Sequence, residues 1–450
     1  MKKIIIFISL ETYLRNWIEA GAFLELDSNF EVLYVIPQYD WDPKHIEKYG
    51  ILNYKVIYQD ELRKSTFRKV LSITMARYAG RSEAFKIKLS LYSKITRIKY
   101  KLLSLNFIYH LYMILIKLKL GIWKEFDEII GTFKPDLVIA PSLAADSFTI
   151  DMTYTANLRK VKSLILINSW DNLVSKGVIP IKPSFVALWG DQGLNQAIRV
   201  QKIKPSKLKV LGVPRFDIYT KDYLNSDIIY NINNIPLGKK IILYAATSLP
   251  FDDILILRLL NEEISNNAEL SNYVVLFRPH PEMLWRKDET NVMNENLKNI
   301  YIDKQLSDYY FSRFNSTTKD FPSFLNNSKL DYYPELLNSI IGIVAPATTL
   351  VLEGLMVGKP CLLICFSDGK NKILSPDQVA RYDNVKDIMS LEGVISCFNS
   401  VNFLNMFKSF IELCNNKENS GLIRKSTERI VYNDSLSYKE RLYKFVSEII

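Results

Sequence analysis

Continuous apolar runs, separated by helical stretches, dominate the first half of the chain. The helical stretches include Ile18–Leu26 and Gly193–Val200. An unbroken apolar run is typical of a strand that is buried on both faces, so the pattern predicts a parallel sheet covered by helices on each side. The runs expected to form the strands are Ile4–Ile8, Val32–Ile36, Leu137–Ala140, Leu164–Ile167 and Phe185–Leu188.

The same pattern restarts in the second half of the chain. Between the halves, Asp222–Pro236 is rich in Asn, Asp and Tyr and is interpreted as a linker. The sequence therefore predicts an α/β protein with two Rossmann-like domains that face each other across a cleft, with limits at 1–221 and 237–450. The second set of expected strands is Lys240–Ala245, Val274–Phe277, Ile340–Val344 and Cys361–Cys365.

Composition agrees with two full domains. The chain has 450 residues, of which 48% are hydrophobic and 12% aromatic, enough for two ordinary cores. Its cysteines lack the spacing of a metal site and lie in or near apolar runs, so they are expected to be reduced core residues of a cytosolic protein. The start imitates a signal peptide, but its apolar run is short, and Ile4–Leu10 is interpreted as part of the first strand.

The net charge of +10 is concentrated in one segment. Between Arg63 and Lys124 there are fifteen lysines and arginines and one acid, Glu83, so the rest of the chain is slightly acidic. The segment also contains the apolar run Leu102–Ile116, which is too short to span a bilayer. This combination of basic and apolar residues predicts a basic helical insertion at about 62–125. We expect the insertion to lie on the anionic inner face of the cytoplasmic membrane. The alternative is an ordinary insertion with a solvated basic face. Nucleic acid is disfavoured, since no nucleic-acid motif accompanies the charge.

Two segments of the C-terminal half carry the chemistry of a phosphate site. The first, Arg278-Pro279-His280-Pro281-Glu282, follows an expected strand, and the prolines on both sides stiffen the backbone of His280. An imidazole can donate to a phosphate oxygen, and Arg278 could pair with a phosphate through two hydrogen bonds. A structural loop histidine is the alternative.

The second segment, Ala345-Pro346-Ala347-Thr348-Thr349, leads from an expected strand into a helix. Small residues and hydroxyls at a helix N-terminus favour an anion, because backbone N–H groups and the helix dipole point to it. Glu353 follows one turn later on the same face and could bind a ribose. Plain helix capping by threonine and a surface glutamate are the alternatives. Together the two segments predict a site for a nucleotide donor.

Three expected strand ends of the N-terminal half carry candidates for an acceptor site and a catalytic carboxylate. Trp170-Asp171-Asn172 is the most suggestive, because an aromatic face beside a carboxylate and an amide suits a sugar, although an Asx turn with a packed tryptophan is the alternative. Asp171 is preferred as the catalytic carboxylate, before Glu11 and then Asp146, with Asp151 further along the chain. Arg15 and Asn16, close to Glu11, are candidate acceptor-binding residues.

Other chemistry is disfavoured. Asp40-Trp41-Asp42 has a metal-binding form, but positive groups and a helix N-terminus can stabilise a leaving phosphate instead, so no metal or cofactor is expected. Asp252-Asp253 is interpreted as helix N-terminal charge. The chain has no Gly-x-Gly-x-x-Gly, P-loop or zinc spacing, which argues against a dehydrogenase, an NTPase and a zinc hydrolase.

These motifs resemble those of bacterial glycosyltransferases with the GT-B fold that build surface polysaccharides. Among them the chain is similar to sialic acid and Kdo transferases and to CDP-glycerol glycerophosphotransferases. The resemblance implies that His280-Pro281 and Thr348-Thr349 hold the nucleotide phosphate and that Glu353 contacts ribose hydroxyls. It also implies that His280 takes part in catalysis by stabilising the charge that develops there.

The expected function is transfer of a sugar from a nucleotide donor, foremost a CMP-activated ulosonic acid, to a bacterial surface glycan or a lipid-linked glycan. A CDP-glycerol or UDP-sugar transferase would share the fold and most of the site. A sugar-nucleotide isomerase like UDP-N-acetylglucosamine 2-epimerase has the same two-domain plan. A non-catalytic membrane-binding or nucleic-acid-binding protein would depend only on the basic segment.

Overall fold

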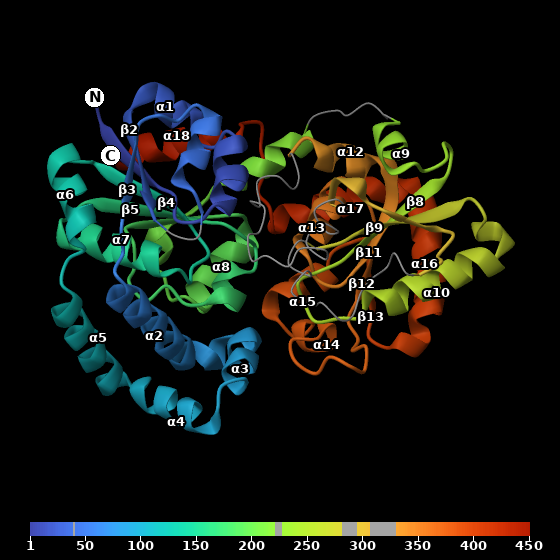
Figure 1. Ribbon diagram of the computed structural model, residues 1–450, viewed down its shortest axis with the longest axis horizontal. Helices are drawn as coiled ribbons and strands as arrows, with labels where there is room; N and C mark the ends of the chain where they lie inside the picture. The colour runs from blue at the N-terminus through green and yellow to red at the C-terminus, as the bar shows by residue number, and fades with distance from the viewer. Residues whose placement is uncertain (39–40, 221–226, 281–294, 307–329) are drawn as a thin grey trace. The chain divides into compact units, whose positions relative to one another are not determined.

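The computed structural model describes residues 1–38, 41–220, 227–280, 295–306 and 330–450. They form two compact units, and each has one parallel sheet between helices (Figure 1). The first unit comprises Met1–Asp217 together with Arg429–Ile450, and the second comprises Ile218–Glu428. The predicted α/β class with two Rossmann-like domains is confirmed.

The N-terminal unit contains a seven-stranded parallel sheet in the order β3-β2-β1-β4-β5-β6-β7. Strand β1 is fully buried from Ile4 to Phe7, as its unbroken apolar run predicts. All five predicted strands form, and β3 and β7, which are short and partly exposed, were not predicted. The strands are β1 (Lys3–Phe7), β2 (Glu31–Pro37), β3 (Tyr54–Ile57), β4 (Leu137–Ser142), β5 (Lys162–Ile167), β6 (Phe185–Leu188) and β7 (Leu208–Val210).

Helices cover both faces of this sheet. The helix predicted over Ile18–Leu26 is interrupted, because Gly21 adopts a positive φ of 71° between a π-helical turn at Leu14–Glu19 and α1. The helices of this unit are α1 (Leu24–Asn29), α2 (Glu61–Tyr78), α3 (Glu83–Ser90), α4 (Lys94–Leu103), α5 (Asn106–Leu120), α6 (Lys124–Phe133), α7 (Ser147–Leu158), α8 (Asp191–Arg199) and α18 (Tyr438–Ile449).

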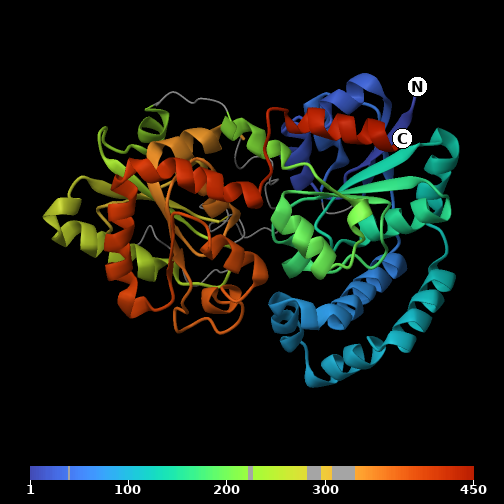
Figure 2. The ribbon, with the colours of Figure 1, turned by 180° about the vertical axis from the view of Figure 1, so that it is seen from behind.

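The basic insertion is helical, as predicted. Helices α2 to α5, residues 61–120, form a lobe beside the N-terminal sheet, and we call them the helical lobe (Figures 1 and 2). Its interior is an apolar cluster in which Phe67, Val70 and Ile73 of α2 meet Tyr109 and Met113 of α5.

The C-terminal unit contains a six-stranded parallel sheet in the order β10-β9-β8-β11-β12-β13. All four strands predicted here form, and the short edge strands β10 and β13 were not predicted. The strands are β8 (Lys240–Ala245), β9 (Tyr273–Arg278), β10 (Ile300–Ile302), β11 (Ile340–Ala345), β12 (Cys361–Ile364) and β13 (Val394–Cys397). The helices are α9 (Ile228–Asn233), α10 (Asp253–Asn266), α12 (Tyr332–Ser339), α13 (Thr349–Met356), α14 (Pro376–Val379), α15 (Asp383–Met389), α16 (Phe403–Asn415) and α17 (Ser420–Ser426).

The domain limits differ from the predicted 1–221 and 237–450 at the end of the chain. The last residues return to the N-terminal unit, where α18 packs beside α1 (Figure 2). Arg441 of α18 is buried, and its Nε donates to the Leu211 carbonyl at 2.8 Å and its Nη2 to Asp217 at 3.3 Å. The Trp17 and Tyr438 rings meet edge to face. These contacts make the final helix part of the first domain.

The predicted linker includes a helix. Residues 222–226 lie outside the described chain, whereas Ile228–Asn233 forms α9. Ile229 is fully buried, and Asn233 Oδ1 accepts a hydrogen bond from the Lys304 amide at 2.9 Å. Residues 228–233 therefore belong to the C-terminal unit and are not a linker.

Candidate functional site

The C-terminal sheet brings the two predicted phosphate-binding segments to one edge. Its strands run parallel in the order 3-2-1-4-5-6 when counted within the unit, so the direction of winding reverses between β8 and β11. Ligands of such sheets bind outside the carboxyl ends of the strands at this reversal. The segments that follow the neighbouring strands β9, β8 and β11 are residues 279–280, 246–248 and 346–349, and we call them the C-terminal strand ends.

Thr348 occupies the N-cap position of α13, in the extended conformation expected there (φ −143°, ψ 159°). Its side chain is half-buried and, within the described chain, does not cap the helix. Plain helix capping, the alternative to a phosphate contact, therefore does not account for the Thr348 side chain. Thr349 is the first residue of the helix itself.

Helix α13 packs closely on β11. A Cβ on Gly354 would lie 2.2 Å from Ile343 Cδ1, so any larger residue there would have to displace the Ile343 side chain. The helix begins at Thr349, four residues after the end of β11. Its dipole and backbone N–H groups point to the position where a donor phosphate is expected.

Glu353 is buried with 8% of its surface exposed, and it accepts a hydrogen bond from the Tyr219 hydroxyl. The buried carboxylate therefore has a hydroxyl partner inside the C-terminal unit. Its oxygens have capacity for a second hydroxyl, such as that of a ribose. Tyr219 was not among the predicted site residues. It lies 134 positions before Glu353 in the chain, so no local sequence pattern could have indicated the contact.

Arg278 and His280 lie two positions apart in the sequence but in different surroundings. The Arg278 guanidinium is buried, forms an ion pair with Asp303, and donates to Gln305 at 3.1 Å. Burial alone would lower the pKa of Arg278, but Asp303 together with Tyr332 and Tyr333 outweighs it, and the pKa is raised. Arg278 thus ties β9 to the segment after β10. His280 is half-buried at the end of β9, and Pro281 lies outside the described residues.

The N-terminal sheet repeats the same reversal of order, here between β1 and β4. Glu11 follows β1, Asp146 follows β4 and Asp171 follows β5, and these strands are neighbours. The structure therefore brings all three predicted carboxylates to one edge of one sheet. We call residues 8–11, 143–146 and 168–171 the N-terminal strand ends.

Near Glu11, polar side chains form two sets of contacts. The Glu11 carboxylate lies 2.8 Å from His45 Nδ1. Arg15 donates to Asn16 Oδ1 at 3.2 Å, and Asn16 in turn donates to Asn168 Oδ1 at 3.3 Å. The predicted acceptor residues Arg15 and Asn16 are thus held beside the end of β5. His45 and Asn168 take part in these contacts without having been predicted.

Asp146 and Asp151 have well-defined structural partners. Asp146 caps α7 by accepting from the Thr149 amide at 2.7 Å and the Ser142 hydroxyl at 3.0 Å. Burial raises the pKa of Asp146, and these hydrogen bonds oppose the shift. Asp151 is fully buried and accepts from Arg63 Nε at 2.7 Å.

Asp171 begins a π-helical turn at Asn172–Lys176. Its carboxylate accepts from the Ser175 hydroxyl at 2.5 Å and from Asn172 Nδ2 at 3.3 Å. Asn172 is fully buried and its Oδ1 accepts from the Ser169 amide, three residues earlier in the chain. An Asx turn would instead accept from an amide two residues later, so this bond is not the one expected for it. Trp170 is only 7% exposed, so the fold covers most of the aromatic face that was expected to meet a sugar.

Lys88, on α3 of the helical lobe, reaches the same turn. Its Nζ donates to the Ser175 carbonyl. Burial lowers the pKa of Lys88 to about 8, the charge of Lys176 acts in the same direction, and Asp171 opposes both. Lys88, with its lowered pKa and its place near Asp171, is therefore an ionisable group close to the N-terminal strand ends. Like His45, it was not predicted from the sequence.

No group of three or more His, Cys, Asp or Glu side chains suited to a metal ion occurs within the described ranges. Of the Asp40-Trp41-Asp42 motif, Asp40 lies outside these ranges. The four cysteines are free, and Cys361, Cys365 and Cys397 are buried, as predicted for core residues.

Comparison with known proteins finds a family match over part of the chain. Residues 194–312 match the family model described as CDP-glycerol:poly(glycerophosphate) glycerophosphotransferase. This range includes β8, β9 and His280. No curated protein matches the sequence.

Solved structures are similar over the whole chain. A glycosyltransferase from Rickettsia africae has 13% identity and a TM-score of 0.54, covering 100% of this chain and 98% of its own. The fold is that of the GT-B enzymes. A co-structure of S. aureus MnaA with UDP (12% identity, TM-score 0.52) covers 100% of this chain and 98% of its own. The UDP-GlcNAc 2-epimerase of Methanocaldococcus jannaschii (14% identity, TM-score 0.50) covers 95% and 98%. The family match agrees with an enzyme of the transferase class, and the solved structures show the GT-B fold.

Proposed function

We propose that this GT-B protein is a transferase that takes a glycerophosphate or sugar group from a pyrimidine-nucleotide donor and passes it to a hydroxyl of a surface-glycan acceptor. CDP-glycerol is the donor that we favour. The observation that carries this choice is the family match over residues 194–312, because it includes the strand end that bears His280.

In this proposal the donor phosphates lie at the C-terminal strand ends. His280 donates to a phosphate oxygen, and the N-terminus of α13 with Thr348 and Thr349 binds the same group. Glu353 orients the ribose. His280 and the N-terminus of α13 would stabilise the negative charge that grows on the leaving nucleotide as the bond to the transferred group breaks.

The acceptor is assigned to the N-terminal strand ends. An acceptor hydroxyl attacks the phosphorus of the glycerophosphate group, its oxygen forms the new P–O bond, and CMP leaves. The proton of the hydroxyl passes to a carboxylate, for which Asp171 is the first candidate and Glu11 the second. Arg15, Asn16, Trp170 and Asn172 would shape the surroundings of the acceptor.

A UDP-sugar enzyme is the second candidate, since a neighbour with the same fold was solved with UDP and others are named as UDP-GlcNAc 2-epimerases. The CMP-activated ulosonic acid, expected first from the motifs, finds no particular support in the comparisons and stays a prediction.

The test is to incubate the full chain separately with CDP-glycerol, CMP-sialic acid, CMP-Kdo and UDP-N-acetylglucosamine, with and without a glycerol phosphate or glycan acceptor. Acceptor-dependent release of CMP from CDP-glycerol supports the favoured function. Acceptor-dependent release from a CMP-sugar, or release of UDP, replaces the donor. Conversion of UDP-N-acetylglucosamine without any acceptor assigns an epimerase instead.

A further inference from the structure

Helix α5 is apolar on two opposite faces. Its inner face packs into the helical lobe through Tyr109 and Met113, which are 8% exposed. Its outer face carries six exposed apolar side chains at helical spacing, which we call the outer stripe. The outer stripe comprises Phe107 (79% exposed), Ile108 (38%), Leu111 (47%), Ile114 (54%), Leu115 (56%) and Leu118 (76%).

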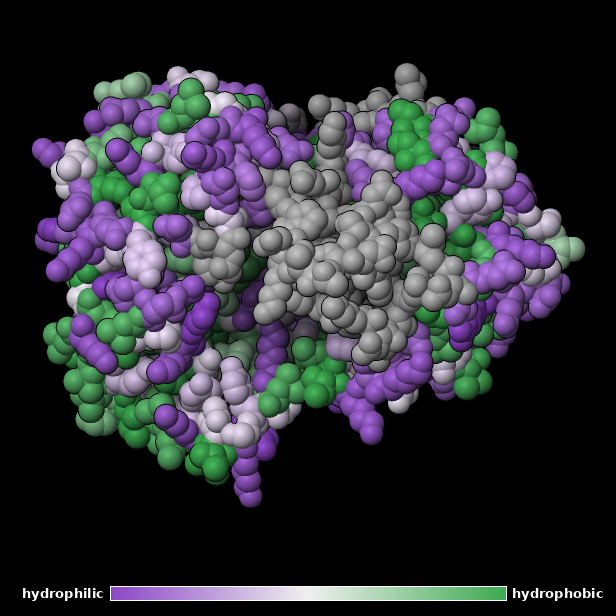
Figure 3. All heavy atoms as spheres, in the orientation of Figure 1, coloured by the Kyte–Doolittle hydropathy of each residue, from purple (hydrophilic) through white to green (hydrophobic). Residues whose placement is uncertain are grey.

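Such a stripe needs an explanation. A helix that is apolar all round is normally buried, and contiguous exposed apolar patches mark interaction sites. The space-filling view shows apolar residues gathered at the lower left, over α4 and α5, with hydrophilic residues between them (Figure 3).

The preceding helix, α4, adds positive charge next to more apolar surface. None of its residues is buried. Ile95, Ile98 and Leu102 form one exposed row at spacings of three and four. Each of these three residues is preceded in the sequence by a basic residue, so a row of positive charge lies beside the apolar row. We call Lys94, Arg97 and Lys101 the basic row.

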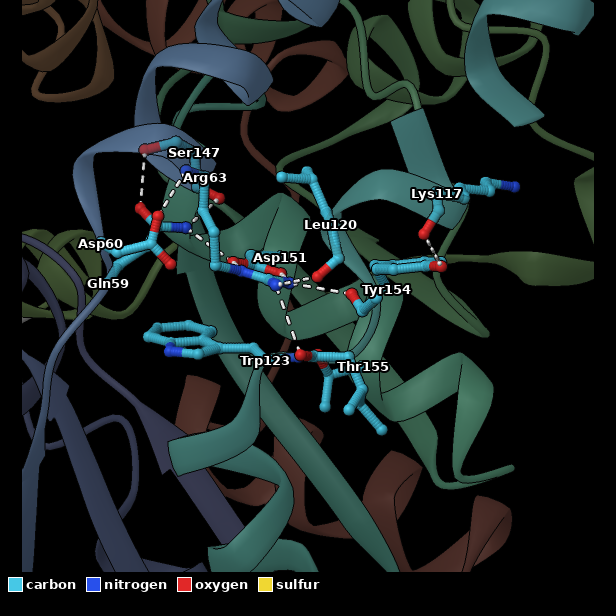
Figure 4. Close-up of polar contacts among 12 residues, drawn as sticks. Gln59, Asp60, Arg63, Lys117, Leu120, Trp123, Ser147, Asp151, Tyr154 and Thr155 are labelled. Atoms are coloured by element: carbon cyan, nitrogen blue, oxygen red, sulfur yellow. Dashed lines mark hydrogen bonds and ion pairs between the residues drawn. The ribbon is translucent and has the colours of Figure 1, made fainter. Parts of the chain in front are cut away.

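The lobe is firmly joined to the N-terminal sheet. Arg63 of α2 is buried and forms an ion pair with Asp151 of α7, and its Nη1 donates to the Leu120 carbonyl at the end of α5 at 2.7 Å (Figure 4). Asp151 lies on the helix that Asp146 caps at the N-terminal strand ends. Whatever binds the outer stripe is thus tied to the proposed acceptor side of the enzyme.

We propose that α4 and α5 lie flat on an anionic lipid bilayer, with the outer stripe in the acyl boundary and the basic row against the headgroups. This proposal goes beyond the proposed function and does not rest on it. Charge complementarity carries it, since residues 63–124 contain fifteen basic residues and one acid.

The geometry favours lying on the membrane over crossing it. Within the described chain no single helix combines the length and apolarity of a membrane span, and the one helix pair that does so jointly, α4 with α5, bends by 87°.

Two other partners fit the surface less well. Nucleic acid would pair with the basic charge but leave the outer stripe in water. A second copy of this chain would bring two strongly basic lobes together.

The test uses the full chain and vesicles of either phosphatidylcholine alone or phosphatidylcholine with phosphatidylglycerol, separated by sedimentation. We expect binding at least about tenfold stronger to the anionic vesicles at low salt, falling as NaCl screens the attraction. A stripe variant, Leu111→Gln with Leu115→Gln and Leu118→Gln, should lose most binding. Its matched control changes exposed leucines elsewhere, Leu52→Gln with Leu237→Gln and Leu422→Gln, and should bind as the wild type does.

Charge is tested separately. Lys94→Gln with Arg97→Gln and Lys101→Gln should lose the preference for anionic vesicles, whereas the control Lys48→Gln with Lys204→Gln and Lys425→Gln should keep it. Thermal melting of every variant shows that it is folded.

The outcomes decide between the partners. Wild-type protein that does not bind the vesicles, or a stripe variant that binds as tightly as its control, overturns the proposal. A stripe variant that changes only the oligomeric state, by sedimentation velocity, assigns the surface to a second copy. Salt-sensitive binding to duplex DNA but not to vesicles assigns it to nucleic acid.

Discussion

The two sheets share one strand order but differ in the charge at their strand ends. The N-terminal strand ends contain three carboxylates, Glu11, Asp146 and Asp171. The C-terminal strand ends contain no acid, and instead carry hydroxyls, a histidine and the start of α13. Carboxylates repel phosphate but can accept a proton from a hydroxyl, whereas a helix N-terminus attracts phosphate. In the proposed function, one topology thus serves the donor in one domain and the acceptor in the other.

The largest effect is expected at the donor end. His280→Ala should lower turnover about 1,000-fold, because a donor to the developing phosphate charge is lost. The melting temperature should change little, since His280 is half-buried in a loop. His110→Ala, an exposed change on α5, is the control and should keep full turnover. Equal losses of turnover and stability would refute the role of His280.

At the acceptor end, two carboxylates should behave differently. Asp171→Asn should lower kcat about 100-fold through loss of a general base. Asp146→Ala should leave kcat close to normal but lower the unfolding free energy by about 1 kcal/mol, since it removes the cap of α7. Steady-state kinetics and urea unfolding of both variants check this. The reverse pattern would make Asp146 the acceptor-side carboxylate.

The domain assignment predicts a sizeable effect far from both sites. Arg441→Met should lower the unfolding free energy by about 2 kcal/mol, because buried hydrogen bonds to Leu211 and Asp217 are lost while the acidic partners stay partly solvated. Lys439→Met breaks a more exposed pair with Glu25 and should cost under about 0.5 kcal/mol. Urea unfolding measures both, and equal values would contradict the role of α18 in the first domain.

A smaller effect is expected for the ribose contact. Glu353→Gln should raise the donor KM about tenfold, as for loss of one hydrogen bond to a charged group, with kcat within a factor of about two. Glu412→Gln, an exposed change on α16, should alter neither. A fall in kcat at unchanged KM would place Glu353 in the chemical step.

The subtlest effect concerns Lys88. The folded chain loses the Lys88 proton near pH 8, while the unfolded chain keeps it to about 10.5, so the contribution of this group to stability increases with pH across that window. In Lys88→Gln this increase is absent. Urea unfolding of wild type and variant from pH 7 to 10.5 should show a difference that changes within the window. As the control, Lys86→Gln, at an exposed position, should show the same change of stability with pH as the wild type. If Lys88→Gln also follows the wild type across the window, Lys88 is not desolvated and the prediction is wrong.

The long apolar runs and the strand-end motifs could be read from the sequence, because burial on both faces leaves a strong local pattern. The edge strands β3, β7, β10 and β13 could not, since three or four partly exposed residues leave almost none. Contacts between distant segments were also missed. The return of α18 to the first domain, the Arg63–Asp151 pair and the Tyr219–Glu353 contact each join positions more than 80 residues apart.

The most direct test of the donor end is a thermal shift with CMP, CDP and UDP. At about one hundred times its dissociation constant a nucleotide adds roughly 2.7 kcal/mol of stability. We expect stabilisation by a cytidine nucleotide in the wild type and in Asp171→Asn, and its loss in His280→Ala and Thr348→Val. Stabilisation that survives His280→Ala and Thr348→Val but disappears in Asp171→Asn would place the nucleotide at the N-terminal strand ends and contradict the division between the two domains.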